Sequence, residues 1–176
     1  NTLCLMPTGG GKSLIYQVAG LCMEKTTIII SPLIALMNQQ NAEMRAKGIS
    51  TVSFSGMDYK KQFALITDMA NGVMPQYIFT SPERISSDGY LEYALNKRRD
   101  DIGLVVVDEA HCISQWGDGF RPAYRNIPDF LDRIFGGDGW PATLCLTATL
   151  NEEQQQQVIK DFHISNVVKG ENLWRK

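Results

Sequence analysis

The sequence predicts an α/β domain with a mainly parallel sheet flanked by helices on both faces. Short apolar runs rich in β-branched residues alternate with longer amphipathic stretches, which is typical of βαβ units. The run at residues 104–107 is continuously apolar, as expected of a central strand covered on both faces. The 176 residues suffice for one domain with a sizeable core and are too few for two ordinary ones.

In chain order, strands are predicted at residues 3–6, 27–31, 51–54, 77–80, 104–107, 143–146 and, as a short further candidate, 166–169. Helices are predicted between them. An apolar stripe at helical spacing marks residues 13–23, and residues 33–47 end at Gly48, a left-handed stop. Asp58 can cap a helix that stops at Gly72, and Asn151 can cap the last one. Residues 118–139, rich in Gly, Pro and aromatics, predict a loop with a short helix around 127–134.

Composition excludes several classes of protein. With a formal net charge of −2, bulk charge does not predict a nucleic-acid partner, and the clusters Lys60-Lys61 and Lys97-Arg98-Arg99 are interpreted as solvated surface. No apolar run is long enough to cross a bilayer, so we expect a cytoplasmic protein without a membrane partner. The cysteines form no CxxC pair and are expected to be small buried hydrophobes: Cys4, Cys22, Cys112 and Cys145.

A glycine-rich segment, MPTGGGKS at residues 6–13, follows a predicted strand and opens a predicted helix. Glycines let backbone N–H groups converge on a polyphosphate, and the helix adds the positive end of its dipole. Lys12 can reach the outer phosphates, and the Ser13 hydroxyl can ligate Mg²⁺. Met6 stands where the strict P-loop pattern has Gly, and a plain glycine turn is the alternative. The predicted nucleotide-binding residues are Thr8, Gly9, Gly10, Gly11, Lys12 and Ser13.

Two acids, Asp108 and Glu109, come directly after the buried strand at residues 104–107. Ligands bind at the carboxyl ends of strands in open α/β sheets, so Asp108 should face the same rim as the glycine-rich loop. We expect Asp108 to hold Mg²⁺ and Glu109 to orient and deprotonate the attacking water. A helix cap or surface pair is the alternative, which the four apolar residues before the pair and the glycine-rich segment elsewhere in the chain disfavour.

These motifs, with others, resemble helicase superfamily 2 and, within it, the RecQ family. MPTGGGKSLIYQ is similar to motif I of that family, ISPLIALMNQQ to motif Ia, FTSPERI to motif Ib, and LTATL to motif III. DEAHCISQWGDGFRPAY is similar to motif II running into an aromatic-rich loop, and is the most specific match. The resemblance implies a RecA-like P-loop NTPase domain that uses ATP and Mg²⁺.

The resemblance also implies residue roles. Catalysis would involve Glu109, Lys12, Asp108 and His111, and the ATP and DNA sites would be coupled through His111, Gln115, Thr147 and Thr149. Nucleic-acid contacts would come from Ser31, Thr80, Ser81, Arg84, Trp116, Phe120 and Arg121. Strand-end capping is the alternative for Ser31, and packing of the loop onto the core is the alternative for the rings. Packing is the expected fate of Tyr124.

The aromatic-rich loop departs from the family. Asp118 and Gly119 replace the usual His-Asp pair, and Ala123 replaces an acid. The resemblance further implies that residues 1–176 are a truncated first RecA-like domain whose partner would be a second such domain. Alone, the chain is expected to bind nucleotide weakly and to turn it over poorly.

Three functions fit the sequence. The first is an ATP-driven DNA helicase motor acting on single-stranded and duplex DNA, three-prime to five-prime by resemblance, in the nucleoid of a bacterium or the nucleus of a eukaryote. The second is an RNA helicase or duplex translocase, which the Gln115-Trp116-Gly117 sequence disfavours. The third is a nucleotide-dependent binding module without catalysis, which the intact Lys12, Asp108 and Glu109 disfavour.

Overall fold

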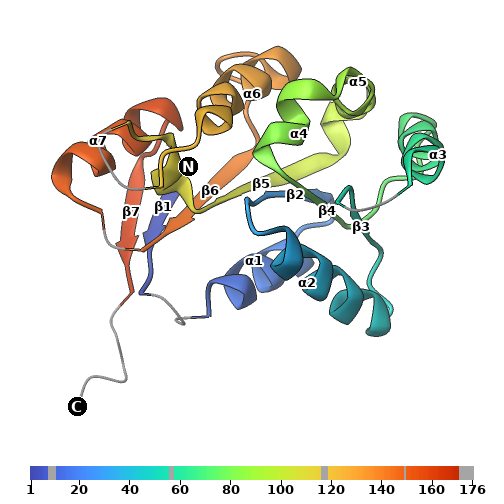
Figure 1. Ribbon diagram of the computed structural model, residues 1–176, viewed down its shortest axis with the longest axis horizontal. Helices are drawn as coiled ribbons and strands as arrows, with labels where there is room; N and C mark the ends of the chain where they lie inside the picture. Colours follow the sequence, from blue (N-terminus) through green and yellow to red (C-terminus); the bar gives the residue numbers. More distant parts are fainter. Residues whose placement is uncertain (8–10, 56–57, 116–118, 149, 171–176) are drawn as a thin grey trace.

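A seven-stranded sheet forms the centre of the molecule (Figure 1). The computed structural model describes residues 1–7, 11–55, 58–115, 119–148 and 150–170. Within them, the strand order is β3-β4-β2-β5-β6-β1-β7, and every neighbouring pair is parallel. The strands are β1 (Thr2–Leu5), β2 (Thr26–Ile30), β3 (Thr51–Ser53), β4 (Tyr77–Thr80), β5 (Ile102–Asp108), β6 (Ala142–Thr147) and β7 (Asn166–Lys169).

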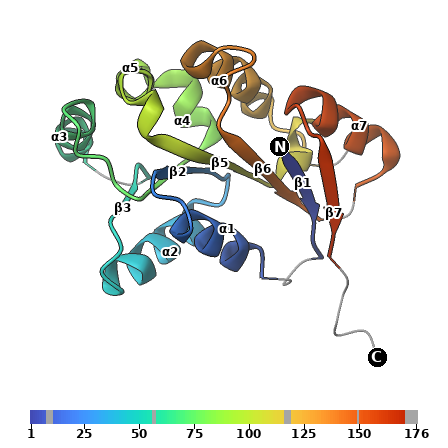
Figure 2. The ribbon, with the colours of Figure 1, turned by 180° about the vertical axis from the view of Figure 1, so that it is seen from behind.

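Helices cover both faces of the sheet (Figures 1 and 2). One face carries α1 (Lys12–Leu21) and α2 (Ile34–Ala46). The other carries α3 (Tyr59–Ala70), α4 (Pro82–Ser87), α5 (Gly89–Lys97), α6 (Ile127–Phe135) and α7 (Glu152–Asp161). Short 3₁₀ turns complete the described elements: η1 (Arg99–Asp101), η2 (Ala110–Ile113) and η3 (Pro122–Asn126).

Strand β5 is buried on both faces, because the domain has three layers with the sheet between two layers of helices. Val105 and Val107 pack in the core beneath α3 to α7, and Leu104 and Val106 pack in the core beneath α1 and α2. Because side chains alternate along a strand, a strand buried on both faces must be apolar at every position. The prediction of a central strand at residues 104–107 is confirmed, although β5 extends beyond it at both ends.

The predicted strands are all present, and the helix boundaries follow the expected signals in most cases. Gly48 and Gly72 adopt positive φ after α2 and α3. Asn151 accepts from the Gln154 backbone in a full capping box. Asp58 occupies the N-cap position of α3 as predicted, but its side chain accepts no cap hydrogen bond.

Two helices, α4 and α5, were not predicted from the sequence. Both helices are short, and a side chain at the N-cap stabilises the start of each. The Ser81 side chain accepts from the Arg84 N–H, with Pro82 in the first helical turn. The Asp88 side chain accepts from the N–H groups of Tyr90 and Leu91.

All four cysteines are free. Three are buried as expected, but Cys22 ends α1 at the surface, which corrects the prediction for that residue. Of the basic clusters, only Arg98 is partly buried, and it pairs with Asp101 at 3.1 Å. Among the described helices, none is both long and apolar enough to span a membrane.

Candidate active site

The predicted motifs meet at the carboxyl edge of β1, β5 and β6, which are consecutive neighbours in the sheet. Asp108 ends β5 and Thr147 ends β6. The segment leaving β1 is tied to the same edge, because the Met6 N–H donates to the Thr147 carbonyl at 2.9 Å. This shared edge is where ligands bind in open parallel sheets.

Gly11 turns the chain into α1. It adopts φ 80°, a left-handed conformation that glycine accepts without steric cost, and its carbonyl accepts from the Leu14 N–H at 3.0 Å. Lys12 and Ser13 then occupy the first turn of α1, the positive end of the helix dipole. Thr8, Gly9 and Gly10 lie outside the described residues.

Lys12 joins the two motifs directly. Its Nζ lies 3.6 Å from Oε1 of Glu109, and both side chains are mostly buried. The carboxylate therefore faces the ammonium group that we expect to hold the outer phosphates. The structure thus brings together residues almost a hundred positions apart in the sequence, as the shared-edge argument requires.

Asp108 is a buried carboxylate held by its neighbours. Oδ1 accepts from the Glu109 N–H at 3.0 Å, and Oδ2 accepts from the Ser31 hydroxyl at 3.4 Å. Burial, reinforced by the adjacent Glu109 charge, raises the pKa of Asp108. A buried carboxylate that is costly to ionise gains from a nearby cation, so Asp108 fits the expected Mg²⁺ role.

The described residues contain no group of three or more His, Cys, Asp or Glu side chains that could hold a metal ion by itself. This fits Mg²⁺ in particular, because that ion is usually held by one or two protein oxygens together with substrate phosphates and water. Asp108 and Ser13 would supply the protein oxygens.

Glu109 adopts φ 53°, one of two positive-φ residues other than glycine in the described chain. Such a conformation costs about 1–3 kcal/mol and concentrates at functional sites. It directs the carboxylate between Lys12 and His111, whose Nδ1 lies 3.3 Å from Glu109 Oε2. The same Nδ1 lies 2.8 Å from the Thr147 hydroxyl oxygen. His111 thereby links the Glu109 carboxylate to the end of β6.

Two residues beside the site were not assigned a role from the sequence. The Tyr16 hydroxyl donates to the Gln40 side chain, which ties α1 to α2. Burial, with the nearby Asp108 charge, raises the pKa of Tyr16 well above its ordinary range. The Tyr16-Gln17 pair stood in the quoted motif I, but a tie between two helices requires their packing to be known.

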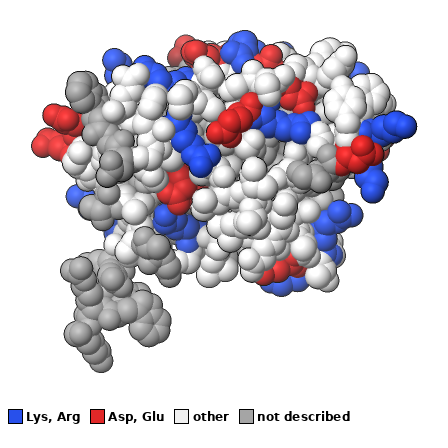
Figure 3. Space-filling view, in the orientation of Figure 1, with Lys and Arg blue, Asp and Glu red and all other residues white. Residues whose placement is uncertain are grey.

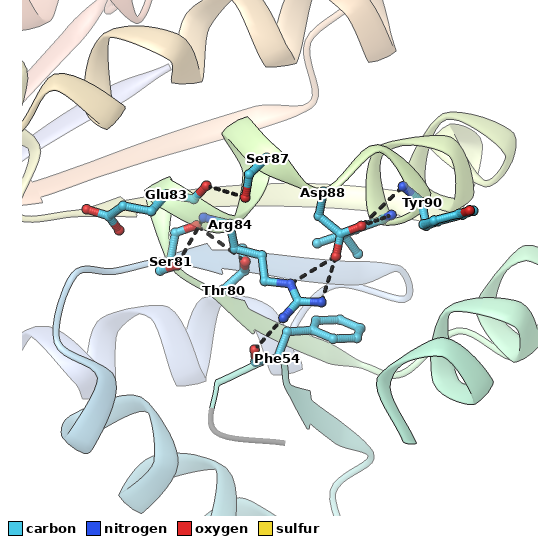
Figure 4. A network of polar contacts seen from close by, with 9 residues as sticks. Phe54, Thr80, Ser81, Glu83, Arg84, Ser87, Asp88 and Tyr90 are labelled. Carbon is cyan, nitrogen blue, oxygen red and sulfur yellow. Dashed lines mark hydrogen bonds and ion pairs between the residues drawn. The ribbon is translucent and has the colours of Figure 1, made fainter. Parts of the chain in front are cut away.

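The residues expected to contact nucleic acid lie at the same carboxyl edge, toward β2, β3 and β4, in varied settings (Figure 4). Thr80 is buried, and Ser81 caps α4. The Ser31 hydroxyl both donates to Asp108 and accepts from the Leu33 N–H at 3.2 Å, as expected for strand-end capping. The Arg84 guanidinium is bound within the protein, donating to Asp88 and to the Phe54 carbonyl.

The aromatic-rich loop is described only at its ends, since Trp116 and Asp118, like Thr149, lie outside the described residues. Gln115 is exposed and Phe120 partly so. Arg121 is exposed and lies 3.5 Å from Glu83. Tyr124 is fully buried, and its hydroxyl donates to the Asp108 carbonyl at 2.7 Å, so the expectation that this ring packs on the core is confirmed.

Charge alone does not mark a nucleic-acid surface. Figure 3 shows basic and acidic side chains interspersed over one face, with a broad, largely uncharged area over α1 and α2. The nucleic-acid site is therefore expected at the carboxyl edge of the sheet from the position and chemistry of its residues.

Comparison with known proteins identifies the family. The sequence model of the DEAD/DEAH box helicases matches residues 1–158. The chain is 37% identical to the ATP-dependent DNA helicase RecQ of Bacillus subtilis, over 98% of this chain and 31% of that protein. It is 33% identical to the probable ATP-dependent DNA helicase RecS of the same organism, over 98% of this chain and 33% of that protein.

The helicase domain of Hef from Pyrococcus furiosus has the same fold, with a TM-score of 0.65 at 22% identity over 97% of this chain and 34% of that one. The chain thus spans about a third of the length of these bacterial relatives. The predicted RecA-like fold and the resemblance to RecQ helicases are both confirmed. The chain belongs to the DEAD/DEAH box helicase family and, within it, is similar to the RecQ DNA helicases.

Proposed function

We propose that this chain is the ATP-binding motor domain of an ATP-dependent DNA helicase, coupling ATP hydrolysis to translocation on single-stranded DNA and to unwinding. The single observation that carries the proposal is the approach of Lys12 to Glu109 at 3.6 Å on the edge that Asp108 shares. Phosphoryl transfer asks mainly for positioning and charge stabilisation, and this edge offers both.

The residues divide the chemistry as follows. The glycine-rich segment and the Lys12 ammonium would bind the phosphates, while Ser13 and Asp108 would hold Mg²⁺, which would supply charge stabilisation for the phosphate oxygens. Glu109 accepts a proton from the attacking water. His111 keeps the Glu109 carboxylate in place through the contact at 3.3 Å, and its hydrogen bond to Thr147 fixes the ring.

DNA is the proposed nucleic acid because the RecQ proteins of Bacillus subtilis and Haemophilus influenzae, at 37% and 31% identity, are named as ATP-dependent DNA helicases. The contacts would come from the edge formed by Ser31, Thr80 and Ser81 and from the loop that includes Trp116, Phe120 and Arg121. A second RecA-like domain of the same protein would complete the nucleotide site, and translocation would run three-prime to five-prime. The protein would act in the bacterial nucleoid or the eukaryotic nucleus.

The experiment is an ATPase assay on the complete gene product that contains this chain, with single-stranded DNA, duplex DNA or RNA added. We expect the largest stimulation with single-stranded DNA and strand displacement from three-prime-tailed duplexes. Stimulation by RNA or by duplex alone would instead indicate the RNA helicase or translocase reading. Nucleotide binding without hydrolysis under all conditions would indicate a non-catalytic module.

A further inference from the structure

An open groove of about 810 Å³ lies away from the ATP site, between the start of α3 and the α4–α5 junction. We call it the aromatic groove and define it by Tyr59, Arg84, Ser87, Gly89, Tyr90 and Tyr93. The three tyrosines are 60–68% exposed. Phe63 stands edge-on against the Tyr90 ring, with centroids 5.8 Å apart, and so supports it from α3. Large rings exposed together in a concave site indicate a surface that binds something planar or apolar.

The floor of the groove is a hydrogen-bonded network in which one positive and one negative side chain are paired. Arg84 donates from Nη2 and Nε to the Asp88 carboxylate at 2.6 and 3.0 Å, and from Nη1 to the Phe54 carbonyl at 3.2 Å. Its guanidinium also lies 5.5 Å from the centre of the Phe54 ring (Figure 4). Because the cation is committed to a carboxylate within the protein, the floor offers flat surface rather than free charge.

The groove continues the edge where the nucleic acid is proposed to bind. Phe54 directly follows β3, and Ser81, the N-cap of α4, directly follows β4. Figure 4 shows Arg84 between Ser81 on one side and Asp88 and Tyr90 on the other. A strand lying along Ser81 would therefore reach the groove without leaving the carboxyl edge of the sheet.

The charges around the groove also suit a polyanion. Lys60 and Lys61, assigned above only to solvated surface, are exposed in the first turn of α3 beside Tyr59. Asp58 offsets one of them. The nearby Glu92 is paired with Arg133 at 2.6 Å, as Asp88 is with Arg84. With two lysines and one aspartate, the start of α3 beside Tyr59 carries one net positive charge.

We propose that the aromatic groove binds unpaired nucleobases of the strand held by the motor, by stacking on Tyr59, Tyr90 and Tyr93. This inference rests on the proposed function and extends its nucleic-acid site beyond motif Ib. Aromatic stacking suits a translocating protein because every base presents a π-face, whatever the sequence. A protein partner is the competing occupant, but no aliphatic side chain lines the groove within the described part of the chain.

The test compares two oligothymidylates on the complete gene product, one of about 6 nucleotides and one of about 20, which bracket common single-strand site sizes. The longer one should reach the groove, whereas the shorter one should occupy only the edge at Ser81. Tyr59→Ala and Tyr93→Ala should each weaken binding of the longer strand about 5-fold or more, the equivalent of one lost stacking contact. Binding of the shorter strand and basal ATPase should stay unchanged, and Tyr93→Phe should bind as wild type.

Gly89 allows a second, independent variant. A Cβ at this position meets nothing within 4 Å, so a side chain can be added to the groove wall without a clash. Gly89→Glu should weaken binding of the longer strand by placing a carboxylate beside the bases, whereas Gly89→Ala should not. Glutamate is favourable in the first turn of α5, so loss of folding is not the expected cause.

Crosslinking gives a direct readout. Iodouracil in the longer strand should attach to the tryptic peptides spanning residues 48–60 and 85–97, which contain the three tyrosines. If wild type binds both strands and the groove variants bind each strand as tightly as wild type does, the groove inference fails and the proposed function stands. Equal weakening of both strands also overturns the inference. If wild type binds neither strand and DNA does not stimulate its ATPase, the proposed function itself fails.

Discussion

Replacing Glu109 with Gln separates nucleotide binding from hydrolysis, and the structure indicates opposite effects on the two. The amide keeps the shape of the side chain but cannot accept a proton from water. General base catalysis contributes about 10²–10⁴-fold, so turnover should fall by that factor. Lys12 contacts Oε1 of Glu109, whereas His111 contacts Oε2, so both carboxylate oxygens are engaged within the site.

The affinity of Glu109→Gln for ATP should equal or exceed that of the wild type. Lys12 lies 3.6 Å from Glu109, and this ion pair would loosen if Lys12 turned to the phosphates. Both side chains retain about a fifth of their exposure, so the pair is screened by solvent and contributes at most about 1 kcal/mol. Removing that competition should tighten ATP binding by up to about 5-fold.

The assay is steady-state ATPase with single-stranded DNA, together with titration of a fluorescent ATP analogue, on wild type and Glu109→Gln. Glu109→Asp is the matched control, because it keeps a base but moves it away from the water. Turnover at the wild-type level in Glu109→Gln would refute the role of Glu109 as general base. ATP binding weakened more than 10-fold would refute the competition between Glu109 and phosphate for Lys12.

Four further changes test other parts of the site. Lys12→Ala should weaken ATP binding and turnover together, by about 1.5–3 kcal/mol for one charged contact, in the same two assays. Arg84→Ala should lower the free energy of unfolding by about 1.5–3 kcal/mol in urea, because Asp88 loses its partner. An unchanged urea midpoint would contradict that role. Asp108→Asn should abolish Mg²⁺-dependent turnover yet raise the melting temperature without nucleotide, because the neutral amide escapes the cost that raises the pKa of Asp108. Phe120→Ala should spare basal ATPase and reduce stimulation by DNA. A matching loss of basal rate and melting temperature would mean that the ring serves packing alone.

The strands and the ATP motifs could be predicted because their signals are local. A continuous apolar run such as residues 104–107 specifies a strand buried on both faces, and a glycine-rich turn before Lys12 specifies a phosphate loop. The strand order, by contrast, is not specified by any local sequence signal. Its consequence, that β5, β6 and β1 lie side by side, decides that Asp108, Thr147 and Lys12 share one edge.

The internal ion pair of Arg84 was not predicted from the sequence. Its place in motif Ib suggested a nucleic-acid contact, yet its guanidinium is bound to Asp88 one helical turn away. That spacing was readable, since residues four apart on a helix face each other. It was missed because α4 and α5 were not predicted, and without a helix the spacing has no meaning.

The bond between His111 and Thr147 bears on how the divergent loop can communicate with the ATP site. His111 Nδ1 is engaged by Glu109 and Thr147, so its other ring nitrogen faces away from both. On that side lies Gly119, where a Cβ would come within 3.4 Å of Nε2. Gly119 also adopts φ 88°, which a side chain would strain. Glycine at this position thus lets the backbone pass close to His111. The Arg121 N–H, bonded to the Cys112 carbonyl at 2.9 Å, holds the returning end of the loop against the same turn. The His111 ring is thus in contact with Glu109, with the end of β6 and with this loop.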